Sequence, residues 1–155
     1  AWAQEPANRP PDAPRAPVIT AAYRLDYVIA EVENGKKTNS RTYTLMIDES
    51  GEANTHMGLR VPVQGDKGPI YMDVGLRIDA KLRPRQDDVL WLSTRFELSS
   101  LAESGSNVSG APPVRNVEFS TATTITPGKS IVLSGGDDLG SQKRFELSVT
   151  VTKVR

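Results

Sequence analysis

Apolar and polar residues alternate with a period of two along most of this chain. The alternation is strictest between Ile70 and Leu82, where every second position is apolar and the positions between are mostly charged. The apolar positions are Ile70, Met72, Val74, Leu76, Ile78, Ala80 and Leu82. Because successive side chains of a strand point to opposite faces, this pattern predicts one long strand with one buried face. At about 3.3 Å per residue it would extend on the order of 40 Å, which suits an elongated sandwich or a barrel wall.

The same period recurs in further segments, which turn-forming residues separate. These segments are 23–30, 42–47, 57–63, 90–98, 117–125, 131–133 and 145–151. Asn34-Gly35 is the strongest turn signal, because both residues tolerate the positive φ of a tight hairpin turn. No window holds a helical period. We therefore expect an all-β fold, a mostly antiparallel meander of about eight strands with an elongated sandwich or barrel-like shape.

Proline is concentrated at the start of the chain. Five of the eleven prolines are Pro6, Pro10, Pro11, Pro14 and Pro17. They exclude a helix and predict an extended Pro-rich arm over residues 1–19, followed by a single all-β domain over 20–155. Ala1 and Ala3 before Gln4 resemble the end of a bacterial secretory signal, so residues 1–3 could be its remnant. Cleavage before Ala1 and cleavage after Ala3 both fit, and either predicts an exported protein, whether periplasmic, outer-membrane-associated or extracellular.

The overall composition narrows the classes of partner. The 155 residues include 19 basic and 19 acidic side chains, and this balance argues against nucleic acid or an anionic membrane surface. The chain has no cysteine, so disulfides and thiolate metal sites are excluded. No apolar run approaches the roughly 20 residues that a transmembrane helix needs.

The stretch TPGKSIVLSGG, residues 126–136, contains the Gly-Lys-Ser of a phosphate-binding loop. Such a loop also needs a glycine five residues earlier and a helix afterwards. Position 123 is a threonine, and Ile-Val-Leu follows Ser130 instead of a helix start. Pro127-Gly128 matches a tight turn, in which Pro sets the first corner and Gly takes positive φ at the second. We therefore predict a hairpin turn and no nucleotide binding.

Other residues with chemical potential have simpler structural explanations. His56 is the only histidine, and it falls on the polar side of the 57–63 strand. The acidic pairs 48–49, 87–88 and 137–138 all fall in expected turns, where Asp caps backbone N–H groups. The pair at 137–138 follows two glycines and could also offer oxygen ligands to calcium. Without a nucleophile and base or a ligand cluster, we expect no catalytic, cofactor or metal site, and no enzyme.

Candidate interaction residues are aromatic or lie in the arm. Tyr71 and Trp91 share an otherwise charged strand face, where cross-strand ion pairs are expected. They could cover the sheet, contact a subunit or stack on a sugar. Val18 and Ile19 lead from the arm into the first strand, and they could let the arm pair with the sheet edge of a neighbouring copy.

Two segments resemble the β-domain of secretins, the outer-membrane rings of type II and type III secretion and pilus machines. The first, 70–101, has an Asp-Val-Gly-Leu strand, an acidic turn and an apolar strand ending in Ser-Ser. In the second, 112–138, a Pro-Gly-Lys turn leads to Ile-Val-Leu-Ser-Gly-Gly, and 144–154 resembles the closing strands. The resemblance covers about half of the chain and implies antiparallel hairpins, assembly from many copies and no catalysis. Where the resemblance implies a gate segment, the chain has the short stretch DDLGSQK.

Together these features predict a non-enzymatic structural or assembly protein of the bacterial cell envelope or exterior. It would self-associate as a filament or ring subunit through strand edges and the arm, as a homo-oligomer or polymer, and other envelope proteins are further possible partners. The alternative is a monomeric secreted binding module for a glycan, a peptide or an envelope complex. Tyr71 and Trp91 would be its natural contacts.

Overall fold

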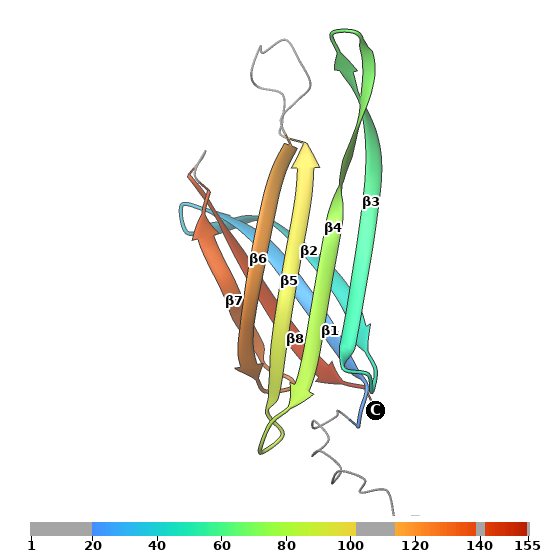
Figure 1. Ribbon diagram of the computed structural model, residues 1–155. Helices are drawn as coiled ribbons and strands as arrows, with labels where there is room; N and C mark the ends of the chain where they lie inside the picture. Colours follow the sequence, from blue (N-terminus) through green and yellow to red (C-terminus); the bar gives the residue numbers. More distant parts are fainter. Residues whose placement is uncertain (1–19, 102–113, 139–141, 155) are drawn as a thin grey trace, which may run out of the picture.

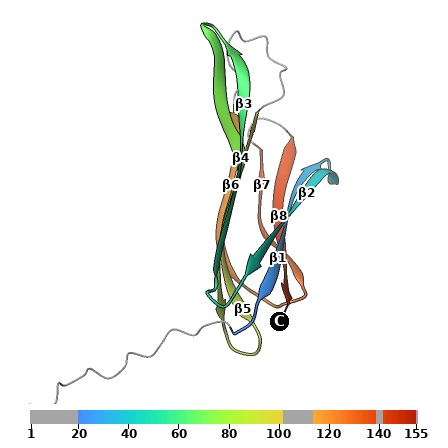
Figure 2. The same cartoon turned by 90° about the vertical axis from the view of Figure 1, so that its right-hand side faces the viewer.

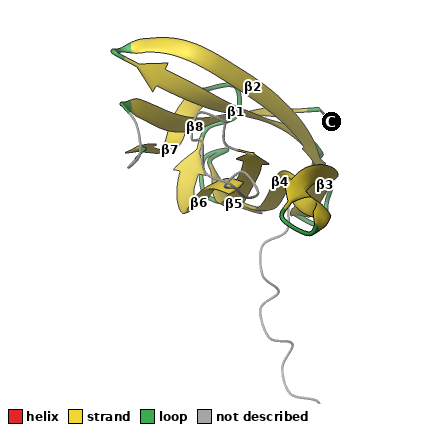
Figure 3. Cartoon of the chain, turned by 90° about the horizontal axis from the view of Figure 1, so that it is seen from above, coloured by secondary structure: helices red, strands yellow, loops and turns green. Residues whose placement is uncertain are grey.

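The computed structural model describes residues 20–101, 114–138 and 142–154, and all their regular elements are strands (Figure 3). The elements are β1 (Tyr23–Glu33), β2 (Lys36–Ile47), β3 (Glu52–Gly65), β4 (Gly68–Pro84), β5 (Leu90–Leu101), β6 (Val114–Ile125), β7 (Ser130–Asp137) and β8 (Lys143–Lys153). The prediction of an all-β fold with eight strands is confirmed. No helix in the described ranges has the length and apolar character to cross a membrane. The predicted arm, with Val18 and Ile19, falls outside the described residues.

The strands form two four-stranded antiparallel sheets that pack face to face (Figures 1 and 2). One sheet has the order β3-β4-β5-β6 and follows the chain as a meander. The other has the order β2-β1-β8-β7, because β8 returns to pair with β1 along its whole length, from Tyr23 opposite Lys153 to Glu33 opposite Lys143. The fold is thus an elongated sandwich, and the last strand lies in the middle of a sheet beside the first.

Turn chemistry explains where the chain reverses. Asn34 and Gly35 both have positive φ, 52° and 77°, in the predicted hairpin turn. Asp87 and Asp88 also have positive φ, and they form the acidic turn between β4 and β5. At 126–129 the Lys129 N–H donates to the Thr126 carbonyl at 3.2 Å, which confirms a turn. That turn does not close a hairpin, however, because β6 and β7 belong to different sheets and the chain crosses from one layer to the other.

The core lies between the two sheets and follows the predicted alternation. Leu76, Ile78, Ala80 and Leu82 of β4 are at most 4% exposed, while the charged residues between them face outward. They pack against the inward residues of β1 and β8, which include Leu25, Ile29, Leu147, Val149 and Val151. Each of the Leu, Ile and Val side chains contributes about 1.5–3 kcal/mol on burial, so the packed sheets are the main source of stability.

One polar contact joins the two sheets inside this core. The Tyr27 hydroxyl of β1 lies 2.8 Å from Thr94 Oγ1 of β5, and both side chains are buried. Burial raises the pKa of Tyr27 from 10.0 to about 12, although the hydrogen bond to Thr94 acts in the opposite direction. The ring of Phe96 completes the contact, with its centroid 6.5 Å from that of Tyr27 and 6.1 Å from that of Tyr43.

Candidate assembly surface

The two aromatic candidates share one sheet face but lie at opposite ends of it. Tyr71 is 63% exposed and sits near the turn between β3 and β4. Trp91 is half-buried and lies opposite Arg83, at the other end of β4. The separation along the strand is on the order of 40 Å, since each residue rises about 3.3 Å. The structure therefore does not bring the two aromatic rings together in one ligand site.

The other candidates, the histidine and the acidic pairs, lie on the exposed surface or in turns. His56 is exposed on β3, opposite Arg77. Asp48 accepts a hydrogen bond from the Ser50 N–H at 2.9 Å, and its hydrogen bonds from Ser50 lower the pKa of the carboxyl. Asp137 pairs with Arg144 at 3.4 Å, and Asp138 pairs with Arg115. Across the described ranges, no group of three or more His, Cys, Asp and Glu side chains is placed to hold a metal ion.

The outward face of the β3-β4-β5-β6 sheet carries a network of exposed ion pairs. Arg60 and Asp73 pair across β3 and β4 at 3.2 Å, with both side chains at least 70% exposed. Arg95 of β5 contacts Glu118 of β6 at 3.1 Å and Glu97 at 2.8 Å. These two carboxylates, Glu118 first, raise the pKa of the Arg95 guanidinium. Exposed pairs of this kind add little stability, because both side chains remain solvated.

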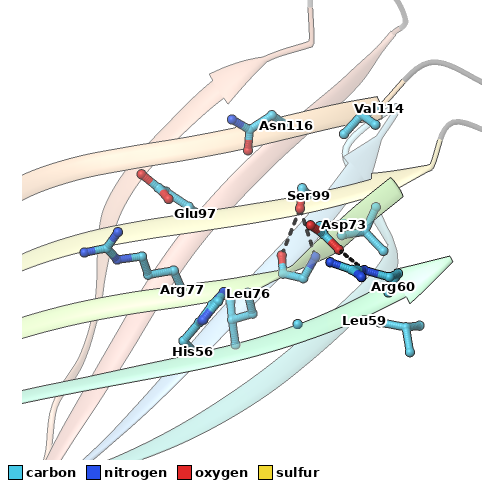
Figure 4. Close-up of a pocket in the computed structure, with 13 residues that line it drawn as sticks. His56, Leu59, Arg60, Asp73, Leu76, Arg77, Glu97, Ser99, Val114 and Asn116 are labelled. Carbon is cyan, nitrogen blue, oxygen red and sulfur yellow. Dashed lines mark hydrogen bonds and ion pairs between the residues drawn. The ribbon is translucent and has the colours of Figure 1, made fainter. Parts of the chain in front are cut away.

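A pair of glycines marks the point where β4 leaves β5. Gly58 and Gly75 lie opposite each other on β3 and β4, and the pairing of β4 with β5 ends at Gly75 and Ser99. There the Ser99 hydroxyl accepts a hydrogen bond from the Gly75 N–H at 2.9 Å and donates to its carbonyl at 3.3 Å. Beside the two glycines, a hollow of about 620 Å³ opens on the outward face (Figure 4).

Residue 75 has no room for a side chain. A Cβ there would overlap the carbonyl oxygen of Met57 and approach the Cα of Gly58 to 2.9 Å. At Gly58, by contrast, an added Cβ would meet only the His56 ring at 3.9 Å. The β3 backbone therefore crosses close over Gly75, and only glycine fits this strongly twisted crossing.

Beyond the two glycines, the β3–β4 hairpin extends past the rest of the molecule. Figures 1 and 2 show it rising above β5, β6 and the second sheet. In the part of the chain that the structure describes, residues 59–65 and 68–74 pair only with each other. Leu59 and Ile70 face the core side yet are 65% and 50% exposed, whereas Val63 on the same side is buried. A two-stranded ribbon without further strands or a covering layer is by itself only marginally stable in water.

The two sheets end in four open strand edges, and these fall on two sides of the molecule. The chain passes from β2 directly into β3 on one side and from β6 into β7 on the other (Figure 1). Each of these strands has a single neighbour among the described strands, so its outer backbone groups are free to pair. Open edges are templates for strand addition. The sequence alone does not reveal them, since it does not show which strands lie at the edges.

Comparison with known proteins finds a similar fold in secretins. No protein-family model and no curated protein matches the chain. The structure resembles ExeD of Aeromonas hydrophila, with a TM-score of 0.61 and 13% identity over 87% of this chain and 49% of that one. It also resembles the type II secretion system secretin GspD of Escherichia coli K12, with a TM-score of 0.58 and 14% identity over 87% and 50% of the two chains.

A third similar structure comes from a different secretion machine. The secretin domain of InvG from the Salmonella SPI-1 injectisome matches with a TM-score of 0.57 and 12% identity, over 87% of this chain and 63% of that one. The chain thus spans about half to two thirds of the length of these solved structures. The predicted secretin-like fold is confirmed. The structural similarity covers 87% of the chain and so both sheets, whereas the sequence resemblance covers about half of the chain.

Proposed function

We propose that this chain is a non-enzymatic structural subunit of a bacterial envelope assembly, built by self-association. The observation that carries the proposal is the pair of secretin-like sheets whose edges are all open, β2 and β3 on one side and β6 and β7 on the other. The similar solved chains are secretins of type II and type III secretion systems. This similarity supports an envelope location, a structural role and the absence of catalysis.

Strand order supports repeated addition of identical copies. Neighbouring strands alternate in direction across each sheet, and each sheet has an even number of strands. When a second copy follows the first in the same orientation, its β6 therefore runs antiparallel to β3 and its β7 antiparallel to β2. Backbone hydrogen bonds then continue through both sheets at once, which is the geometry that strand addition requires.

The arm provides a second proposed link between copies. Val18 and Ile19 lie just before β1, and an extended Pro-rich segment carries little ordering cost when it docks. We expect deletion of residues 1–19 to weaken assembly while the far-ultraviolet circular dichroism of the sheets is retained. Unchanged assembly would remove the arm from the proposal without affecting the strand edges.

Sedimentation velocity and negative-stain imaging of the purified full chain test the proposed function. We expect oligomers whose share grows with protein concentration and which appear as rings or filaments. A strictly monomeric species at every concentration would overturn self-association and would favour a secreted binding module instead. The separation of Tyr71 from Trp91 favours assembly, because a binding module would need its aromatic contacts close together.

A further inference from the structure

The hollow beside the two glycines crosses the outward face of a whole sheet. One row of facing residues runs through it from β3 to β6, and all of its members line the hollow: Gly58, Gly75, Ser99 and Asn116. At about 4.8 Å between neighbouring strands, this row spans on the order of 14 Å. The side chains that border the row project from the same four strands (Figure 4). The hollow is therefore long enough to hold an extended ligand that lies across the strands.

Packing within the sheet does not require the glycine at position 58. Gly58 has no positive φ, and an added Cβ would meet only the His56 ring, at an ordinary contact distance of 3.9 Å. Gly75, by contrast, is required by the close approach of the β3 backbone. Glycine weakens the interior of a strand, and there it often marks a place where a ligand or another backbone comes close. Gly58 therefore keeps the surface open where a ligand would approach.

The charged side chains around this row already have partners on the protein. The pairs are Arg60–Asp73 at 3.2 Å, Arg77–Asp79 at 3.0 Å and Arg95–Glu97 at 2.8 Å. The two arginines that line the hollow use Nε in these contacts, so their terminal N–H groups stay available as donors. Within the lining, two arginines balance two carboxylates, so an ion would find little net attraction there.

Uncharged groups complete the lining of the hollow. The Asn116 amide and the His56 imidazole have no hydrogen-bond partner among the described residues, and the exposed Val114 adds an apolar patch. This mixture matches a sugar ring, whose hydroxyls both donate and accept and whose C–H groups form an apolar face. A peptide matches less well, because the backbone groups beneath the hollow are already paired in the sheet and strand addition takes place at edges.

We propose that this hollow binds a neutral glycan chain that lies across β3, β4, β5 and β6. Gly58 leaves room for a sugar ring, and the arginines, the carboxylates and Asn116 bond its hydroxyls. The inference goes beyond the proposed function, because the site lies on the outward face of the sheet and uses none of the strand edges.

Isothermal titration calorimetry of the full chain with neutral oligosaccharides tests the site. The probes are chitotriose, maltotriose and cellotriose, and heparin serves as the polyanion control. We expect at least one of the oligosaccharides to bind and heparin not to bind. Gly58→Val should weaken this binding about tenfold or more, because its branched side chain fills the space that the ring needs. Ala122→Val is the matched control, since it adds a branched side chain at an exposed position of β6 on the same face, outside the hollow.

A second pair of variants removes a hydrogen bond instead of space. Asn116→Ala should weaken the binding about threefold to tenfold, because the glycan loses its bond to the amide. Asn54→Ala should leave the binding unchanged, since Asn54 is exposed on the same face of β3 but does not line the hollow. Circular dichroism of all four variants separates a loss of binding from a loss of fold, and Asn116→Ala decides if Gly58→Val does not fold.

Each outcome either supports the glycan site or removes it. Weaker binding by the two hollow variants, with unchanged binding by the two controls, supports the proposal. Full binding by Gly58→Val and Asn116→Ala, or equal losses in the controls, would overturn the assignment of the hollow. Binding of heparin alone, or of none of the oligosaccharides, would overturn the glycan as its ligand. Self-association is measured separately by sedimentation, so failure of this site leaves the proposed function intact.

Discussion

The two ends of β4 carry the same alternation of residues but lie in opposite surroundings. At one end Ile78 and Leu82 are fully buried between the sheets, and at the other Ile70 is 50% exposed on the hairpin beyond Gly58 and Gly75. The residue types are alike, so the difference comes from coverage by the second sheet. An alternating pattern therefore specifies a strand and its inward face, whereas burial depends on which element lies opposite.

Removing a large side chain from the covered end should have the largest effect. Phe96→Ala would leave a cavity beside Tyr27 and Tyr43, and we expect a loss of about 3–5 kcal/mol in the free energy of unfolding, measured in guanidinium chloride. The matched change on the hairpin, Leu59→Ala, should cost less than about 0.5 kcal/mol in the monomer. Similar losses of unfolding free energy for Phe96→Ala and Leu59→Ala would contradict the conclusion that the second sheet covers only one of the two regions.

The buried hydroxyl of Tyr27 should make the covered end sensitive to alkaline pH. The pKa of Tyr27 is raised from 10.0 to about 12 in the folded state. The contribution of the protonated hydroxyl to the free energy of unfolding is therefore complete below pH 10 and is lost as the pH rises through 12, because the unfolded chain releases the proton first. The loss should reach about 2–3 kcal/mol. Comparing Tyr27→Phe with wild type across this pH range isolates the effect, and identical pH profiles would contradict it.

The same Tyr27→Phe variant also tests the contact between the sheets at neutral pH. It leaves the buried Thr94 hydroxyl without its partner, which should cost about 1–3 kcal/mol in unfolding free energy. An unchanged stability at pH 7 would mean that Thr94 finds another partner.

The glycine pair offers a test at the boundary between the two regions. Gly75→Ala should destabilise the protein by about 1–3 kcal/mol, because the new Cβ overlaps the Met57 carbonyl. Hydrogen exchange should become faster first at the backbone amides of residues 59–74. Gly58→Ala is the control, with only the His56 ring nearby, and equal costs for the two variants would show that the crossing is not tight.

The smallest effect should come from the exposed ion pair on the hairpin. Arg60→Ala breaks its contact with Asp73, and the change in unfolding free energy should stay within about 0.5 kcal/mol because both side chains are solvated. A larger loss, measured at low and high salt, would mean that the hairpin depends on charge more than on packing.

Local patterns predicted the strands and turns but not the assignment of strands to sheets. The alternation of β4 and the Asn34-Gly35 turn depend on neighbouring residues, so the sequence shows them directly. The first half of β2 is polar on both faces and was missed, because its residues Lys36–Arg41 are exposed and need no alternation. The pairing of β1 with β8 and the crossing between sheets after Ile125 depend on distant contacts, which no local window encodes.

The candidate surface was predicted in part for the same reason. Tyr71 and Trp91 were placed on the correct face, but their separation along β4 could not be read from alternation alone. Met57 and Leu59 looked like ordinary core residues, because the sequence shows their inward direction and not the missing cover. Their exposure follows from the arrangement of the two sheets, which the sequence alone does not show.

The pairing of the first strand with the last has a mechanical consequence. Tyr23 lies opposite Lys153, and the Val154 N–H donates to the Ala22 carbonyl at 2.9 Å, so the chain enters and leaves the sandwich at the same end. Tension applied between these two points would break the hydrogen bonds between β1 and β8 one after another, starting at this end. Because β1 and β8 are the two central strands, the sheet would separate through its middle.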